Sequence, residues 1–171
     1  PRPLIFLTPS GKRFEQSDAE ELSKLEGFSL LCGRYEGVDQ RVIDHLVDRE
    51  ISLGDFVLSG GEVAALALIE SIVRLIPGVM GNEESSLDES YSSGLLEYPH
   101  YTRPREYEGY ATPSVLLSGD HKAVFKWRRA KSILKTMENR PDMILKRGGL
   151  TEEEQSLLRE YSEGLYEDSE D

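Results

Sequence analysis

Two apolar runs, each ending in a glycine-rich polar turn, place the strongest constraint on what this chain can fold into. The first run ends in the Gly33–Gly37 segment and the second ends in Gly54 and Gly60-Gly61. Each run is typical of a buried strand, and a helical pattern follows each turn. A single Gly-x-x-x-Gly indicates no more than a tight turn. Two in tandem at strand ends favour a small-molecule site, because glycine lets the backbone approach a ligand closely.

The apolar pattern alternates between strands and helices over the first half of the chain. It predicts strands over 4–7, 28–32 and 52–58, and helices over 17–25, 39–47 and 62–75. Such alternation is typical of an α/β fold with a parallel sheet flanked by helices.

The second half has a different character. Residues 82–93 are polar and predict a linker, and a mostly helical region begins beyond Pro104. Helical spacing places five residues on one apolar face: Val124, Trp127, Ala130, Leu134 and Met137. Thr151 to Glu154 predict the cap of a final helix.

The charge is distributed unevenly. The net charge is −12, but residues 152–171 hold nine acidic residues and one basic residue, whereas residues 99–149 hold eleven basic and five acidic residues. The basic region includes six cations on one predicted helix: Lys122, Lys126, Arg128, Arg129, Lys131 and Lys135. On its own, such a helix usually indicates a solvated face.

Composition excludes several classes of protein. The single cysteine, Cys32, allows no intrachain disulfide and lies in an apolar run, so we expect a small buried hydrophobe in a reducing compartment. The printed sequence contains no signal-peptide h-region, no stretch long enough to span a membrane, no phosphate-binding Gly-x-x-x-x-Gly-Lys-Ser/Thr loop and no cluster of Cys and His ligands. We therefore expect a soluble, cytoplasmic protein without a metal site.

Four motifs in fixed order resemble the bacterial-type tRNA (guanine-N1)-methyltransferases, the TrmD family of the SPOUT superfamily. They are Gly-Arg-Tyr-Glu-Gly-Val-Asp from Gly33, Ser-Leu-Gly-Asp-Phe-Val-Leu-Ser-Gly-Gly-Glu from Ser52, Ile-Pro-Gly-Val from Ile76, and Leu-Leu-Glu-Tyr-Pro-His-Tyr-Thr-Arg-Pro from Leu95. The resemblance runs from about Leu4 to about Tyr161. It implies a SPOUT-type parallel sheet with a deep trefoil knot, plus a small, mostly helical C-terminal domain.

The resemblance also implies the domain organisation. Residues 1–81 would form the knotted domain that binds S-adenosylmethionine, residues 82–98 the interdomain linker, and residues 99–171 a small helical tRNA-binding domain with an acidic tail. In the family, about eighty residues precede the strand that corresponds to residues 4–7. They have no counterpart in this sequence, so we expect an N-terminally truncated member.

The family's activity is transfer of a methyl group from S-adenosylmethionine to N1 of the guanine 3′ of the anticodon. By resemblance, the cofactor pocket comprises Phe6, Leu7, Thr8, Pro9, Gly33, Arg34, Tyr35, Glu36, Gly37, Ser52, Leu53, Gly54, Asp55, Phe56, Val57, Leu58, Gly60 and Gly61. The backbone of Leu53, Gly54, Phe56 and Leu58 would contact the adenine edge. Glu36 would offset the sulfonium charge.

Guanine N1 holds a proton that must leave, so a general base is required. In the family this base is a linker aspartate, assisted by an arginine that corresponds to Arg74. An ungapped register places Glu89 at the base position, one residue after Asp88. Glutamate has nearly the same basicity but a longer reach. We expect Glu89 to be the base, with Asp88 as the alternative.

The same resemblance implies the partners. It favours tRNA binding by the basic region, with His100, Arg103, Lys126, Arg128 and Arg129 as candidate contacts. It implies a homodimer whose active site combines the cofactor loops of one subunit with the linker and small domain of the other, and no membrane partner. The alternative function is a protein of the same fold that binds cofactor or RNA without methylating it.

Overall fold

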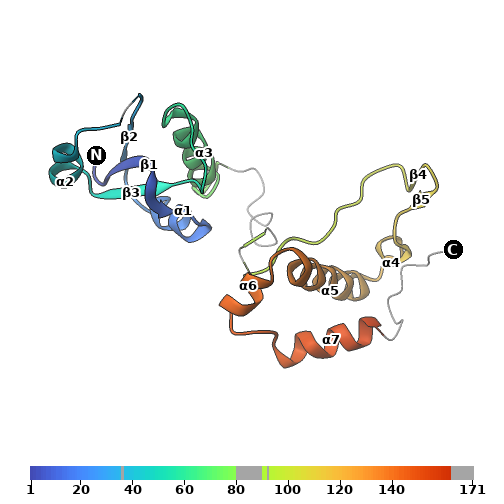
Figure 1. Ribbon diagram of the computed structural model, residues 1–171. Coiled ribbons are helices and arrows are strands. Elements are labelled where there is room, and N and C mark those ends of the chain that lie inside the picture. Colours follow the sequence, from blue (N-terminus) through green and yellow to red (C-terminus); the bar gives the residue numbers. More distant parts are fainter. Residues whose placement is uncertain (36, 80–89, 92, 163–171) are drawn as a thin grey trace. The chain divides into compact units, whose positions relative to one another are not determined.

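The computed structural model describes residues 1–35, 37–79, 90, 91 and 93–162. The chain forms two compact units, Pro1–Ser86 and Leu87–Asp171. The first contains β1 (Leu4–Arg13), α1 (Gln16–Leu22), β2 (Ser29–Cys32), α2 (Gln40–Leu46), β3 (Arg49–Ser52) and α3 (Glu62–Val73). The second contains β4 (Glu106–Tyr107), β5 (Tyr110–Ala111), α4 (Ser114–Leu117), α5 (His121–Asn139), α6 (Pro141–Lys146) and α7 (Glu152–Ser162) (Figure 1).

The first unit is built on a parallel three-stranded sheet in the order β2-β1-β3. This confirms the predicted α/β class, with a parallel sheet flanked by helices. Residues Leu4 to Leu7 of β1 pair with β2 on one side, while Ile5 to Leu7 pair with β3 on the other. All three strands therefore end at the same edge of the sheet.

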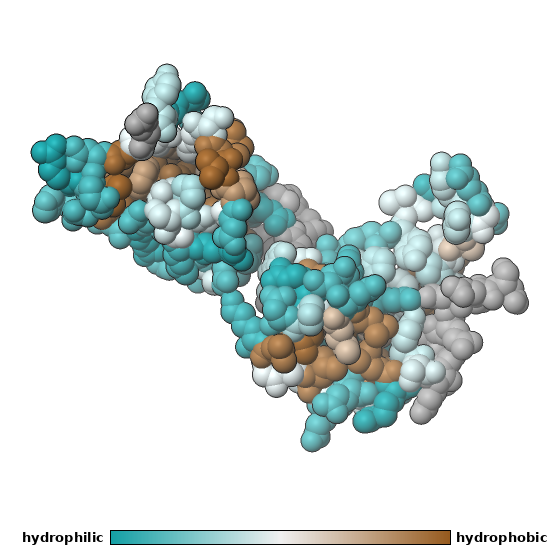
Figure 2. Space-filling view, viewed as in Figure 1, coloured by the Kyte–Doolittle hydropathy of each residue, from teal (hydrophilic) through white to brown (hydrophobic). Residues whose placement is uncertain are grey.

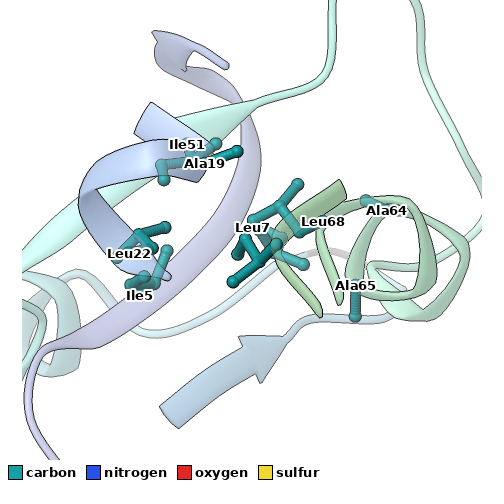
Figure 3. Packing of buried hydrophobic residues seen from close by; sticks show 9 residues of the cluster. Ile5, Leu7, Ala19, Leu22, Ile51, Ala64, Ala65 and Leu68 are labelled. Carbon is teal, nitrogen blue, oxygen red and sulfur yellow. The ribbon is translucent and has the colours of Figure 1, made fainter. Parts of the chain in front are cut away.

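One face of this sheet supports the apolar core. Ile5 and Leu7 of β1 and Ile51 of β3 project to the same side, because alternate residues of a strand share a face. The helices α1 and α3 cover that face with Ala19, Leu22, Ala64, Ala65, Leu68 and Ile72 (Figure 3). Burial of these side chains fixes both helices on the sheet.

β1 is longer than the predicted strand over 4–7. Its register on β3 shifts between Leu7 and Lys12, so that both residues pair with Ile51. Gly11 lies inside this irregularity and packs directly on the β3 backbone: a Cβ at Gly11 would lie 2.5 Å from the carbonyl carbon of Glu50 and the nitrogen of Ile51. Only glycine fits this close approach.

The second unit is organised around α5. Trp127, Ala130 and Ile133 are buried, but Leu134 and Met137 are 37% and 44% exposed, so the predicted apolar face is only partly correct. Two polar residues of this helix, Ser132 and Thr136, are also buried.

Hydroxyl groups explain why the buried face of α5 differs from the apolar pattern. Ser132 Oγ donates to the carbonyl of Leu96 at 2.7 Å, and Thr136 Oγ1 accepts from the N–H of Leu96 at 2.8 Å. The neighbouring Leu95 is 1% exposed. Residues 95 and 96, predicted as part of a linker, therefore pack on α5. The face of α5 that contacts them is the face that is buried.

Within the described residues, every helix is either too short or too polar to cross a lipid bilayer.

Replacing Gly11 with alanine is expected to destabilise the protein by about 1–3 kcal/mol, because the new methyl group overlaps the β3 backbone. Urea denaturation of the wild-type and Gly11→Ala chains measures this difference. Gly27→Ala is the matched control, since its Cβ would lie at an ordinary 3.6 Å from Pro1. Equal effects of the two substitutions would contradict the close-packing explanation.

Candidate functional site

The middle of β1 and the turns that follow β2 and β3 meet at one edge of the sheet. They enclose a cavity of about 280 Å³, near the lower end of small-molecule pockets. Its lining consists of Phe6, Leu7, Thr8, Pro9, Gly33, Arg34, Tyr35, Gly37, Ile51, Ser52, Leu53, Gly54, Phe56, Val57, Leu58, Ser59, Gly60, Gly61 and Ala64.

The structure brings together most of the residues predicted from the sequence to bind a cofactor. Of those that the structure describes, one is not part of the lining. Asp55 lies outside the cavity, where its 87% exposed carboxylate forms an ion pair with Arg13 at 2.6 Å. Glu36 lies outside the described residues. Sequence reasoning missed Ile51, Ser59 and Ala64, which are neighbours of predicted positions.

The segment 53–58 forms a turn and loop, so the predicted strand over 52–58 is wrong. β3 ends at Ser52, whose hydroxyl donates to the carbonyl of Gly54 and accepts from its N–H, both at 3.1 Å. The Phe56 N–H then donates to the same carbonyl at 2.9 Å. These local hydrogen bonds take the place of the hydrogen bonds between strands, so the chain leaves the sheet after Ser52.

The apolar side chains of this loop are therefore exposed at the cavity instead of buried in a sheet. Phe56 is 55% exposed and Val57 is 83% exposed. In the part of the chain that the structure describes, the N–H groups of Val57 and Leu58 form no intramolecular hydrogen bond. The loop thus offers apolar surface together with available backbone donors.

The Gly60-Gly61 pair joins the cavity to α3. The Gly61 N–H donates to the carbonyl of Gly33 at 3.1 Å, and a Cβ at Gly61 would lie 2.9 Å from the Cα of Cys32. The start of α3 is thereby seated against the end of β2. Cys32 is half-buried and not fully buried as predicted. Desolvation raises the pKa of its thiol, which disfavours the thiolate that a nucleophile requires.

An ion pair connects the first glycine turn to the N-terminus of α3. Arg34 Nε donates to Glu62 Oε1 at 2.6 Å, and this hydrogen bond lowers the pKa of the Glu62 carboxyl. A carboxylate in the first turn also complements the helix dipole. Glu62 therefore holds Arg34 beside the cavity.

Of the three predicted catalytic residues, the structure describes only Arg74. Arg74 follows α3 directly, and its backbone N–H donates to the carbonyl of Glu70 at 3.4 Å. Asp88 and Glu89 lie outside the described residues. The structure thus places the arginine but does not test the choice of base.

The predicted RNA contacts divide into two groups. His100, Arg103 and Arg128 line a second cavity of about 1070 Å³ within the second unit. Lys126 and Arg129 instead form ion pairs with Glu160 and Glu154 of α7, at 2.7 and 2.8 Å. These last two cations fix α7 on α5.

The second cavity also contains residues that were not singled out from the sequence. Arg105 lies two positions after Arg103, so a count of local charge would have found it. Arg128 Cζ lies 4.7 Å from the centroid of the Tyr98 ring. The two residues are thirty positions apart, so no sequence spacing predicts this contact.

Glu154 is the centre of a buried polar cluster and is 5% exposed. Its carboxylate accepts from Arg129, from Arg147 at 2.9 Å and from the N–H of Thr151 at 3.0 Å. The Glu154 N–H donates in return to Thr151 Oγ1 at 3.2 Å, which confirms the predicted cap.

The ionisation of Glu154 depends on these partners. Burial alone would raise the pKa of its carboxyl, but the N–H of Thr151 and the guanidinium groups of Arg147 and Arg129 outweigh that effect. The pKa therefore lies below its ordinary value, and the charged form stabilises the fold.

Comparison with known proteins gives consistent matches. The family model described as tRNA (Guanine-1)-methyltransferase TrmD matches residues 1–146. A tRNA (guanine-N(1)-)-methyltransferase of Clostridium beijerinckii is 56% identical over 156 residues, which are 91% of this chain and 64% of that protein. Proteins of the same name from Pelotomaculum thermopropionicum and a Synechococcus species are 48% and 52% identical over 167 residues, 98% of this chain and 66% and 64% of theirs.

The matches do not extend over the whole of these relatives. The chain spans between 59% and 66% of the length of the curated relatives that it matches most strongly.

Glu154→Gln is expected to lower the free energy of unfolding at pH 7 by about 1.5–3 kcal/mol, the range for hydrogen bonds to charged groups. Because the folded-state pKa is lowered, this stabilisation is present above the unfolded-state pKa and disappears as the pH falls through the folded-state value. Urea denaturation of both chains at pH 7 and pH 3 measures the two differences. Glu153→Gln, at an exposed neighbouring carboxylate, is the control. If the stability difference between the wild-type and Glu154→Gln chains were as large at pH 3 as at pH 7, the stabilising role of the charged Glu154 carboxylate would be contradicted.

Proposed function

The chain belongs to the tRNA (guanine-1)-methyltransferase TrmD family, and on that basis we propose that it transfers a methyl group from S-adenosylmethionine to N1 of the guanine 3′ of the anticodon in tRNA. The observation that supports this most directly is the cavity at the carboxyl ends of β1, β2 and β3. Open parallel sheets bind ligands at this edge. The two glycine motifs that resemble the family meet there.

The residues around the cavity fit S-adenosylmethionine. A Cβ at Gly33 would lie 3.3 Å from the Phe6 ring, so a side chain there would have to displace that ring by a few tenths of an ångström. We propose that the backbone of Leu53, Gly54, Phe56 and Leu58 contacts the adenine edge and that the apolar side chains pack on the ring. Glu36 would offset the sulfonium charge. When bound, S-adenosylmethionine supplies an electrophilic methyl group on a positively charged sulfur.

The deep trefoil knot of the SPOUT superfamily is part of the same proposal. It is supported by the parallel order β2-β1-β3 and by the loop after β3, whose end is seated against β2 through Gly61 and Gly33. A knotted path would hold the cavity turns together without any disulfide.

Methyl transfer to guanine N1 requires removal of its proton. We propose Glu89 as the general base, with Asp88 as the alternative one residue earlier. Arg74, at the end of α3, would stabilise the negative charge that develops as the proton leaves.

We further propose a cytoplasmic homodimer in which the small domain, residues 99–171, binds the tRNA. Support for a second copy comes from α3, where apolar side chains occupy an outward face as well as the core face (Figure 2). Val63 and Leu66 are 62% and 67% exposed, and Ile69 and Val73 continue the stripe. Apolar stripes of this kind are usually covered by a partner.

The proposal predicts methyl transfer to the guanine transcript alone. Labelled S-adenosylmethionine is incubated with the chain and with either a tRNA transcript that has guanine 3′ of the anticodon or the same transcript with adenine there. Label on the guanine transcript only is the expected result. Calorimetric binding of S-adenosylmethionine without any transfer would favour a binding protein of the same fold and overturn the proposal.

Removal of the base is expected to slow transfer by at least about a hundredfold, the usual contribution of general base catalysis. Glu89→Ala should show this loss, while Asp88→Ala should retain activity. Initial rates of label transfer measure both, and Glu84→Ala controls for loss of a carboxylate from the same polar segment. Normal rates for Glu89→Ala with a loss in Asp88→Ala would assign the base to Asp88, and normal rates for both would contradict the mechanism.

A further inference from the structure

The loop between β3 and α3, residues 53–59, has few attachments to the rest of its unit. Its start is tied to β3 by the hydrogen bonds between Ser52 and Gly54, and its first residue packs against the core of the sheet. Its end is tied to β2 because the Gly61 N–H donates to the carbonyl of Gly33 at 3.1 Å. Any further restraint on this β3–α3 loop must therefore act at its middle.

The middle of the loop forms an ion pair with β1. Arg13 Nη2 donates to Asp55 Oδ2 at 2.6 Å. Among the described residues, this is the one side-chain hydrogen bond or ion pair that joins residues 53–59 to an element other than the adjoining β3. The positions on either side, 53, 54 and 56–59, line the first cavity, whereas Asp55 does not. The ion pair therefore restrains the loop from outside the cavity.

Arg13 is a firm point of attachment because the end of β1 is held on two sides. Its backbone pairs with Ser52 in the sheet, and the Phe14 N–H donates to the carbonyl of Ser52 at 2.8 Å. The preceding Lys12 donates to Asp18 at 2.6 Å, and Asp18 is buried on α1. The Arg13 guanidinium thus extends from backbone that is fixed relative to β3 and α1. A tether at the middle of a loop divides it into two shorter loops, which have fewer conformations to lose.

The exposure of the pair limits what it can do. The Arg13 and Asp55 side chains are 62% and 87% exposed. Exposed ion pairs contribute little to the free energy of unfolding, because water and salt screen the charges. A small contribution still matters for this loop, since Phe56 and Val57 are largely exposed and hold it weakly. The pair is therefore suited to select one conformation of the loop and not to stabilise the whole unit.

We propose that Arg13 and Asp55 are positioning residues, whose ion pair holds the β3–α3 loop in the conformation that binds the cofactor. The inference rests on the proposed S-adenosylmethionine site and deepens it. Contact with the ligand does not explain Asp55, since its carboxylate lies outside the cavity lining. The loop backbone acts on the ligand, and the ion pair acts only through that backbone.

Cleavage by chymotrypsin after Phe56 tests the loop in the free chain. When opening is fast, the cleavage rate follows the population of chains in which the loop is open. Arg13→Gln, which leaves the cleaved sequence intact, should raise the initial rate at this site by about two- to fivefold, the effect of losing an exposed ion pair. Arg13→Lys should retain most of the protection. Mass spectrometry of the fragments measures the rates, and cleavage after the exposed Tyr110 of the second unit is the internal standard.

Calorimetric titration with S-adenosylmethionine tests the same pair at the site. Arg13→Gln and Asp55→Asn should each weaken binding by about two- to fivefold, because only chains with the loop in place bind. The double variant should bind no more weakly than either single variant, since both substitutions remove one interaction. In the methyl-transfer assay the KM for the cofactor should rise by the same factor while kcat stays unchanged, because neither side chain contacts the reacting atoms.

Arg41→Gln is the matched control. Arg41 forms an exposed ion pair of the same length, 2.6 Å, with Asp39 of the same unit, and neither residue lines the cavity. This substitution should change neither cleavage after Phe56 nor cofactor affinity. Thermal melting is measured for every variant, and the melting temperature of Arg13→Gln should stay close to the wild-type value.

Three results would overturn the proposal. They are wild-type cleavage and affinity in Arg13→Gln, a loss of affinity in Asp55→Asn that Arg13→Gln does not share, and a fall in melting temperature large enough to account for the faster cleavage. The second would assign Asp55 to a partner other than Arg13. If the wild-type chain binds no cofactor or transfers no methyl group, the proposed function fails while cleavage after Phe56 still decides this inference. Methyl transfer with the same cleavage and KM in all variants would retain the function and reject the inference.

Discussion

Backbone-to-backbone contact at the carboxyl ends of three parallel strands determines the shape of the first unit. Gly11 lies against β3, and Gly61 lies against β2, each at a separation that leaves no space for a Cβ. The Gly61 contact seats the start of α3, and α3 in turn covers the core residues of the sheet. The Gly61 contact also forms part of the cavity wall, so folding and site formation share this close approach.

The second unit depends on buried polar groups instead. Ser132 and Thr136 attach residues 95 and 96 to α5, and Glu154 attaches α7 to α5 through two arginines. A buried carboxylate with several partners specifies one arrangement, because removing any partner leaves charge uncompensated.

Much of the fold and of the cavity was predictable because glycines at strand ends have few alternative roles. The α/β class followed from alternation, and the turn residues predicted together do lie together. The prediction of a strand over 52–58 was wrong because the apolar residues 56–58 are typical of a buried strand. The strand ends early, since the Ser52 hydroxyl forms hydrogen bonds with the backbone of Gly54. The prediction of the buried face of α5 was partly wrong for a related reason. Apolar spacing does not include Ser132 and Thr136, whose burial depends on hydrogen bonds with the backbone of Leu96. Pairing of Lys126 and Arg129 with α7 likewise depends on tertiary contacts that no local pattern contains.

The cavity wall made by Gly33, Gly54 and Gly61 is largely main chain, and this has a consequence for protein engineering. An added Cβ at Gly61 meets the Cα of Cys32 at 2.9 Å, and at Gly33 and Gly54 it crowds an aromatic ring at 3.3 and 3.0 Å, so substitution here displaces neighbouring atoms. The side chains free to vary are those at the rim, such as Tyr35, Phe56 and Val57, which are 98%, 55% and 83% exposed. A library that aims to change which ligand enters should therefore diversify the rim and leave the glycines fixed.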